Sequence, residues 1–140
     1  MMPHLLIIDD DELVRDALSL IMASYDFQIS SVASTEEAVE EISSGRRPDA
    51  ILADYRLRGN DTGLRAIQVV RERIGQWIPA VILTGDTSPD RLREISGSGL
   101  PVLHKPALGT TLVASINAAL MGRPSRSRPP RWSCGEGLRA

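Results

Sequence analysis

Near its N-terminus the chain reads Leu5-Leu-Ile-Ile-Asp-Asp-Asp-Glu12, four apolar residues followed directly by four acidic ones. A short apolar block of this kind is typical of a strand that is buried on both faces of a parallel sheet. Two further apolar blocks of the same kind lie at 50–53 and 80–83. Two weaker patterns, at 28–32 and 101–103, suit strands nearer the edges of the sheet. The chain therefore carries five candidate strands.

Helical patterns occupy the stretches between these strands. Apolar residues recur there at spacings of three and four, which gives each stretch one apolar face. The apolar faces run from Leu13 to Met22, Ala38 to Ile42, Leu64 to Ile74, Leu92 to Ile95, and Leu108 to Leu120. Ser34, placed three residues before Glu37, forms a capping box, and Pro89 suits the first turn of the fourth helix. Strands that alternate with helices predict an α/β fold, a doubly wound five-stranded parallel sheet.

The composition limits the class of protein. The chain has 140 residues, 42% hydrophobic and 24% charged, which suits one globular domain better than two. Its apolar runs are far shorter than the ~20 residues of a membrane span, and the block at 5–8 is too short for a secretory signal. The single cysteine, Cys134, excludes a disulfide framework and suits a reducing compartment. We therefore expect a soluble, cytoplasmic protein that does not contact a membrane.

Charge divides the chain at about residue 122. Residues 1–122 contain 11 basic and 17 acidic side chains, whereas residues 123–140 contain five arginines and one glutamate. An acidic domain argues against a nucleic-acid-binding face. The basic segment is rich in Pro and Ser and has no apolar periodicity, a composition typical of disorder. We predict one domain over 1–122 and a disordered tail over 123–140, which is too short for a DNA-binding domain.

Charged or hydroxyl side chains follow four of the five predicted strands. They are Asp9 and Asp10, Asp54, Thr84 and Lys105. Because the carboxyl ends of parallel strands meet at one edge of a sheet, we expect these side chains to lie together. Crowded carboxylates either have raised pKa values or are compensated by a cation, and oxygen ligands with open positions suit Mg²⁺. Asp54, fixed at the end of an apolar strand, is suited to attack a phosphoryl group, whose oxygens Lys105 and Thr84 would bind.

Four segments of the chain share their order and spacing with a known family. They read Leu5-Leu-Ile-Ile-Asp-Asp10, Ala50-Ile-Leu-Ala-Asp54, Ile82-Leu-Thr84-Gly and Leu103-His-Lys105-Pro106. Over residues 4–121 they resemble the receiver domain of bacterial two-component response regulators, and most of all the C-terminal receivers of hybrid histidine kinases. The resemblance implies a flavodoxin-like (βα)5 fold with strand order 2-1-3-4-5 and a cis Lys105–Pro106 peptide bond.

The same resemblance implies a metal site. Asp10, Asp54 and the backbone carbonyl of Arg56 would ligate Mg²⁺, and Asp9 would assist through water. Asp54 would accept a phosphoryl group from the phosphohistidine of a histidine kinase or phosphotransfer protein. The chain would then be a phosphoacceptor that assists its own phosphorylation and dephosphorylation, and not a turnover enzyme.

The resemblance also bears on how a signal would leave the domain. The Thr84 hydroxyl would swing toward the phosphoryl group, and Lys105 would pair with it. Output would pass to a protein partner whose identity the sequence does not give. Any homodimer would form through the face of the fourth helix, fifth strand and fifth helix. The chain departs from the common pattern at Val102, where many receivers carry an aromatic switch residue, and at Arg58, where a proline is usual.

Two alternatives remain open at this point. A haloacid-dehalogenase-type phosphohydrolase would use Asp9-Asp-Asp11, with Gly85-Asp86-Thr-Ser-Pro-Asp90 as its later acidic motif. In that family, however, the lysine precedes the acidic motif, and the chain is short for a cap insertion. The second alternative is a receiver-like module that docks without being phosphorylated, and the complete set of predicted site residues argues against it.

Overall fold

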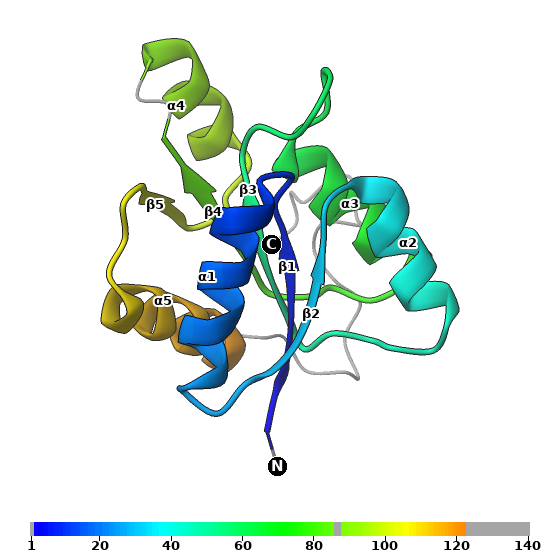
Figure 1. Cartoon of the computed structure of the whole chain (residues 1–140). Helices are drawn as coiled ribbons and strands as arrows, with labels where there is room; N and C mark the ends of the chain where they lie inside the picture. The colour runs from blue at the N-terminus through cyan, green and yellow to red at the C-terminus, as the bar shows by residue number, and fades with distance from the viewer. Residues whose placement is uncertain (1, 86–87, 123–140) are drawn as a thin grey trace.

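A computed structural model describes residues 2–85 and 88–122. The predicted tail over 123–140 and Asp86 of the acidic motif lie outside the described residues. The strands are β1 (His4–Ile8), β2 (Gln28–Val32), β3 (Ala50–Asp54), β4 (Ala80–Thr84) and β5 (Val102–His104). The helices are α1 (Glu12–Ala23), α2 (Thr35–Ser43), α3 (Gly63–Ile74), α4 (Pro89–Gly97) and α5 (Gly109–Met121) (Figure 1). Strands and helices alternate along the whole of the described chain, as the hydrophobic pattern predicts.

The five strands form one parallel sheet in the order β2-β1-β3-β4-β5. This confirms the predicted fold class and strand order. The alternating pattern of β2 is explained by its position at the edge of the sheet, where only part of the strand is buried. The carboxyl ends of β1, β3 and β4 meet at the same edge of the sheet, and the loops that follow them surround the site described below.

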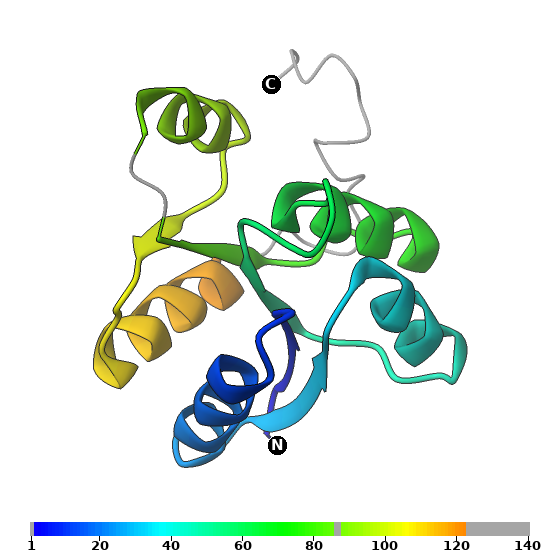
Figure 2. The same ribbon diagram turned by 45° about the horizontal axis from the view of Figure 1, so that its top comes forward.

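Helices cover both faces of the sheet (Figure 2). One half of the core joins α1 and α5 to alternate residues of the central strands, among them Leu5 and Ile7. The other half joins α2, α3 and one residue of α4 to the intervening residues, among them Leu6 and Ile8. Burial on both faces is the reason that the central strands are continuously apolar.

The helix boundaries follow the capping signals. Asp11 is the N-cap of α1, and its carboxylate accepts hydrogen bonds from the next helical N–H groups. Ser34 caps α2 by accepting from the N–H of Glu37 at 3.1 Å, while the Glu37 carboxylate accepts from the N–H of Ala33 at 2.9 Å. Gly75 ends α3 in the left-handed conformation, with φ of 78°. The polar residues at these positions therefore fix where each helix begins and ends.

Three details of the sequence-based prediction are wrong. Leu13 is 80% exposed, because the first turn of α1 precedes the turns that pack on the core through Leu18 and Met22. Leu108 is 73% exposed, because it is the N-cap of α5 and not a residue of its apolar face. The fifth strand begins at Val102, one residue later than predicted, since a proline has no N–H for the sheet ladder.

The helix α4 is attached to the rest of the fold by few contacts. All nine of its residues are described, and of these only Ile95 is buried, whereas α3 buries five residues. In both ribbon views α4 stands apart from the other helices (Figures 1 and 2). Within the described residues, no helix has the length and apolar character to cross a bilayer.

Candidate functional site

A pocket of about 780 Å³ lies at the carboxyl edge of the sheet. Its walls include Asp10, Asp54, Arg56, Thr84, Ser88 and Lys105. These residues come from four different loops or strand ends, which the parallel sheet brings to one rim, as expected from the sequence. The remaining predicted residue, Asp9, is 1% exposed and lies beneath the pocket beside Lys105.

Three carboxylates crowd together at this edge of the sheet. Asp9, Asp10 and Asp54 each offer one oxygen, and these oxygens lie within 4.8 Å of one another. The Lys105 ammonium faces two of them, with Nζ at 3.1 Å from Asp54 Oδ1 and 3.8 Å from Asp9 Oδ2. Arg58 Nε is 4.0 Å from Asp10 Oδ2, but the Arg58 side chain is 84% exposed and solvent weakens that pair. The local charge is therefore negative.

Burial and repulsion act on the protonation of these acids. The pKa of Asp54 is raised to about 6, because burial raises it more than the charge of Lys105 lowers it, and the neighbouring charge of Asp9 acts in the same direction as burial. Burial also raises the pKa of Asp9, against the hydrogen bond from the Asp11 N–H and the charge of Lys105. Both shifts mean that the folded protein holds these negative charges less readily than an unfolded chain does.

The metal-free protein is therefore expected to lose stability as the pH rises through about 6. The pKa of Asp54 in the folded protein lies above the ordinary 3.8. The stability that the protonated carboxyl gives the fold is fully present below pH 3.8, and it is lost as the carboxyl ionises in the folded state. Asp54→Asn carries no charge at any pH. Its free energy of unfolding should be higher than that of the wild type by up to ~3 kcal/mol at pH 8, and this difference should shrink toward pH 4. Urea unfolding in the presence of a chelator measures this, and an equal difference at both pH values contradicts it.

The donor set fits a divalent cation. Among the described residues, Asp9 Oδ2 is a buried carboxylate oxygen that accepts no hydrogen bond, while Asp9 Oδ1 accepts one from the Asp11 N–H at 2.9 Å. A buried anionic oxygen of this kind is costly unless a cation compensates it. Carboxylate oxygens beside an open, polar pocket are the ligands that Mg²⁺ takes. Arg56 lines the pocket, and the ligation by its backbone carbonyl stays a prediction.

The pairing of β4 with β5 positions the remaining two residues. Thr84 ends β4 and is 1% exposed, and its carbonyl accepts the backbone N–H of Lys105 at 2.8 Å. This bond sets where the Lys105 side chain leaves the sheet. The peptide bond that follows, Lys105–Pro106, is cis, as the resemblance implies.

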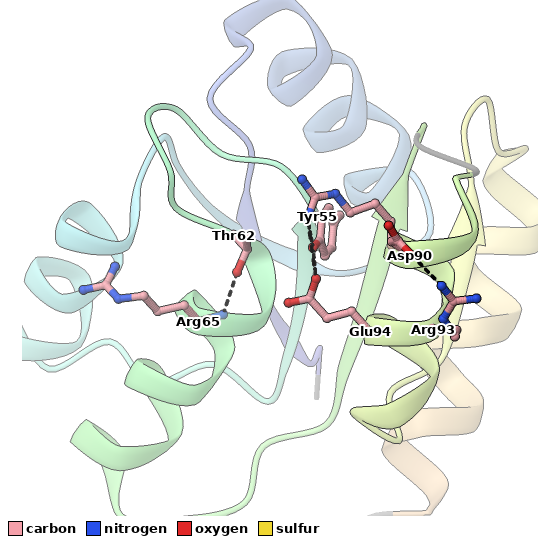
Figure 3. A network of polar contacts seen from close by, with 7 residues as sticks. Tyr55, Thr62, Arg65, Asp90, Arg93 and Glu94 are labelled. Atoms are coloured by element: carbon pink, nitrogen blue, oxygen red, sulfur yellow. Dashed lines mark hydrogen bonds and ion pairs between the residues drawn. The ribbon is translucent and has the colours of Figure 1, made fainter.

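Tyr55 is a residue of this region that the sequence reasoning did not single out. It follows Asp54 directly and is 1% exposed. Its hydroxyl donates a hydrogen bond to the carboxylate of Glu94 on α4 (Figure 3). Burial raises the pKa of Tyr55, and the bond to Glu94 raises it further, so the phenol stays protonated and able to donate. The two partners are 39 positions apart, and the sequence gives no local signal of their contact apart from an aromatic residue after a buried strand.

A doubly wound sheet that gathers three carboxylates and a lysine at its carboxyl edge defines a class, the phosphate-handling α/β domains. The comparison with family models identifies the family. Residues 5–117 match the model described as the response regulator receiver domain. The chain belongs to this family, and it is a receiver domain of the two-component response regulator type.

Characterised relatives agree with this assignment. The chain is 28% identical over 121 residues to the two-component response regulator ORR3 of Oryza sativa subsp. indica, covering 85% of this chain and 92% of that protein. It is 32% identical over 120 residues to the transcriptional regulatory protein AfsQ1 of Streptomyces coelicolor, with 85% of this chain covered. Of AfsQ1 only 52% is covered, so the chain spans about half the length of that relative.

Solved structures show the same fold. The chemotaxis response regulator CheY4 of Vibrio cholerae, crystallised at low pH, superimposes with a TM-score of 0.74 at 25% identity, over 85% of this chain and 99% of that one. A response regulator receiver protein from Sinorhizobium medicae superimposes with a TM-score of 0.74 at 22% identity, over 88% of this chain and 98% of that one. The fold is therefore that of CheY-like receivers.

Proposed function

We propose that Asp54 is the phosphoacceptor of this receiver domain. The observation that carries the proposal is the position of Asp54 Oδ1, 3.1 Å from the Lys105 ammonium and at the open pocket. The carboxylate is 12% exposed and lies at the end of a strand, which holds it in place. A fixed, partly desolvated carboxylate with a cation beside it is suited to attack phosphorus.

In the proposed reaction an Asp54 oxygen attacks the phosphorus of a phosphohistidine on a histidine kinase or phosphotransfer protein. The O–P bond forms as the N–P bond breaks, and the imidazole nitrogen leaves with the electron pair and takes up a proton from solvent. Lys105 neutralises charge on the transferred oxygens, and the Thr84 hydroxyl turns toward them to donate a hydrogen bond. Receiver domains as a class accept phosphoryl groups and are not turnover enzymes.

The acidic cluster is proposed to hold Mg²⁺. Asp10, Asp54 and the Arg56 carbonyl would ligate the ion, and Asp9 would act through a water. The ion would neutralise negative charge between the carboxylates and the incoming phosphoryl group. The Asp9 oxygen that accepts no hydrogen bond and the raised pKa of Asp54 support this assignment.

The output route is a further part of the proposal. We infer that the receiver domain occupies 1–122, with 123–140 as an appended basic tail. A histidine kinase or phosphotransfer protein would supply the phosphoryl group, and a protein partner would read the phosphorylated state. Alternatively, the face formed by α4, β5 and α5 would join two copies of the chain in a homodimer. Sedimentation with and without a phosphodonor distinguishes a homodimer from a monomer that binds a different protein.

The test of the proposed function is a measurement of intact mass. We expect the full chain, incubated with Mg²⁺ and acetyl phosphate, to gain a phosphate-sized mass in most molecules. The gain should fall at least tenfold when a chelator replaces the metal, because crowded carboxylates repel the donor unless a cation compensates them. Loading that survives alkali would point away from an acyl phosphate, because hydroxide and hydroxylamine both cleave that bond.

The result also decides between the alternatives. No gain of mass, with or without metal, contradicts the proposed function and supports a module that docks without being phosphorylated. Steady release of phosphate from a small phosphomonoester, abolished by Asp9→Asn and retained in Asp54→Asn, would support a phosphohydrolase instead.

A further inference from the structure

The attachment of α4 to the rest of the domain depends on one aromatic residue. Apart from Ile95, the residues of α4 are exposed or only half-buried. One polar contact that joins this helix to the end of β3 is the hydrogen bond from the buried Tyr55 hydroxyl to the Glu94 carboxylate (Figure 3). A helix with so little buried apolar surface has a low local stability, so the loss of a specific contact should change its position or its opening measurably.

A second residue of α4 completes this attachment. The guanidinium of Arg91 lies over the ring of Tyr55, with Cζ 5.7 Å from the ring centroid. Its Nη1 is 3.5 Å from the Tyr55 hydroxyl and 3.7 Å from Glu94 Oε1. Tyr55, Arg91 and Glu94 thus form a closed triangle of contacts, which we call the α4 anchor. It contains one positive and one negative charge.

The backbone of Tyr55 is fixed on both sides. Its N–H donates to the carbonyl of Leu83 on β4 at 2.9 Å, and its carbonyl accepts the N–H of Gly63 at the start of α3 at 2.7 Å. Tyr55 is also bonded covalently to Asp54. A displacement of the Asp54 backbone therefore reaches the α4 anchor through a single peptide unit. The two backbone hydrogen bonds of Tyr55 leave it little freedom to relax without moving its side chain. The N-terminal end of α4 meets the same pocket, since Ser88, its N-cap, lines the wall.

We propose that Tyr55 transmits the phosphorylation state of Asp54 to the position of α4, acting through Glu94 and Arg91. This inference rests on the proposed function, because it requires a phosphoryl group on Asp54. Tyr55 acts here as a positioning residue: its side chain points to α4 and does not line the pocket.

The charges of the α4 anchor make it responsive to a phosphoryl group. Phosphorylation replaces the single negative charge of the Asp54 carboxylate with the about 1.5 to 2 negative charges of a phosphoryl group, and places them farther out from the end of β3. The added field attracts Arg91 and repels Glu94, so it favours an arrangement in which the two no longer share the Tyr55 hydroxyl. The consequence is a shift of α4, the helix with the smallest buried surface to resist it.

Hydrogen exchange followed by mass spectrometry tests the proposal on peptides that cover α4. In the wild type, we expect Mg²⁺ with beryllium fluoride, a phosphoryl mimic, to change the exchange of α4 amides several-fold. Tyr55→Phe keeps the ring and removes only the hydroxyl. We expect it to raise exchange in α4 about tenfold without the mimic, and to abolish most of the further change when the mimic is added.

Matched variants separate transmission from a general loss of stability. Glu94→Ala should behave as Tyr55→Phe does, whereas Glu94→Gln, which keeps an acceptor oxygen, should restore most of the basal protection. Arg93→Ala is the control, because it removes the exposed pair with Asp90 on the same helix and leaves the α4 anchor intact (Figure 3). Arg93→Ala should respond to the mimic as the wild type does.

The outcomes distinguish this inference from the proposed function. Tyr55→Phe should still gain the phosphate-sized mass, because its hydroxyl does not line the pocket. If wild type and Tyr55→Phe both gain the mass and α4 responds equally in both, the inference is wrong and the proposed function stands. If the wild type gains no mass, the proposed function fails and the inference fails with it. Loss of the α4 response in Tyr55→Phe alone supports transmission through Tyr55.

Discussion

Asp54→Asn is expected to gain no phosphate-sized mass under conditions in which the wild type gains it in most molecules. The amide that replaces the carboxylate has nearly the same shape, but it is neutral and has no anionic oxygen to attack phosphorus. The substitution also removes one of the three crowded charges, so we expect the folded state to be kept at neutral pH. A complete loss of labelling in a protein that remains folded would therefore be a chemical effect.

Two controls make this result specific. Asp90→Asn changes an exposed carboxylate on α4, outside the pocket, and should be labelled as the wild type is. Asp9→Asn should be labelled more slowly, because it alters the charge beside Lys105 without removing the proposed acceptor. If Asp54→Asn were labelled at the wild-type level, another residue would be the acceptor, and peptide mapping of the added mass would locate it.

Gly63→Ala is expected to destabilise the domain by about 3 kcal/mol, near the upper end of the usual cost of overpacking. A Cβ at Gly63 would lie 2.3 Å from the backbone carbonyl oxygen of Asp54 and 3.1 Å from the Cβ of Ala53. The first of these neighbours is backbone, so it moves only if the end of β3 moves. For a domain of this size we expect the melting temperature to fall by about 10 °C.

Gly97→Ala is the matched control for this substitution. A Cβ at Gly97 meets nothing within 4 Å, and the residue is in the last turn of α4. Alanine should therefore be neutral there or stabilise the helix by up to about 0.5 kcal/mol. Thermal unfolding followed by circular dichroism compares the two variants, and equal melting temperatures would contradict the close approach of α3 to Asp54.

The parts of the site that could be predicted from sequence are those that depend on strand order alone. Asp9, Asp54 and Lys105 each follow an apolar block, and a parallel sheet brings the ends of such blocks to one edge. The apolar runs themselves reflect burial on both faces, which is a property of the sequence that needs no knowledge of side-chain packing.

The contacts that could not be predicted from the sequence are those that depend on how a helix packs against the rest of the fold. The bond from Tyr55 to Glu94 requires the placement of α4, and neither residue has a neighbour in sequence that signals it. Leu13 and Leu108 show the same limit, because helical spacing identifies an apolar face but not the turn at which that face leaves the core.

The buried oxygen of Asp9 that accepts no hydrogen bond has a thermodynamic consequence. A cation that occupies the pocket binds the native fold and not the unfolded chain, so its binding free energy adds to the stability of the fold. The melting temperature should therefore rise as the fraction of protein with a bound ion rises. The melting temperature, recorded against ion concentration, becomes a binding curve that can be obtained without a kinase, a phosphodonor or a partner.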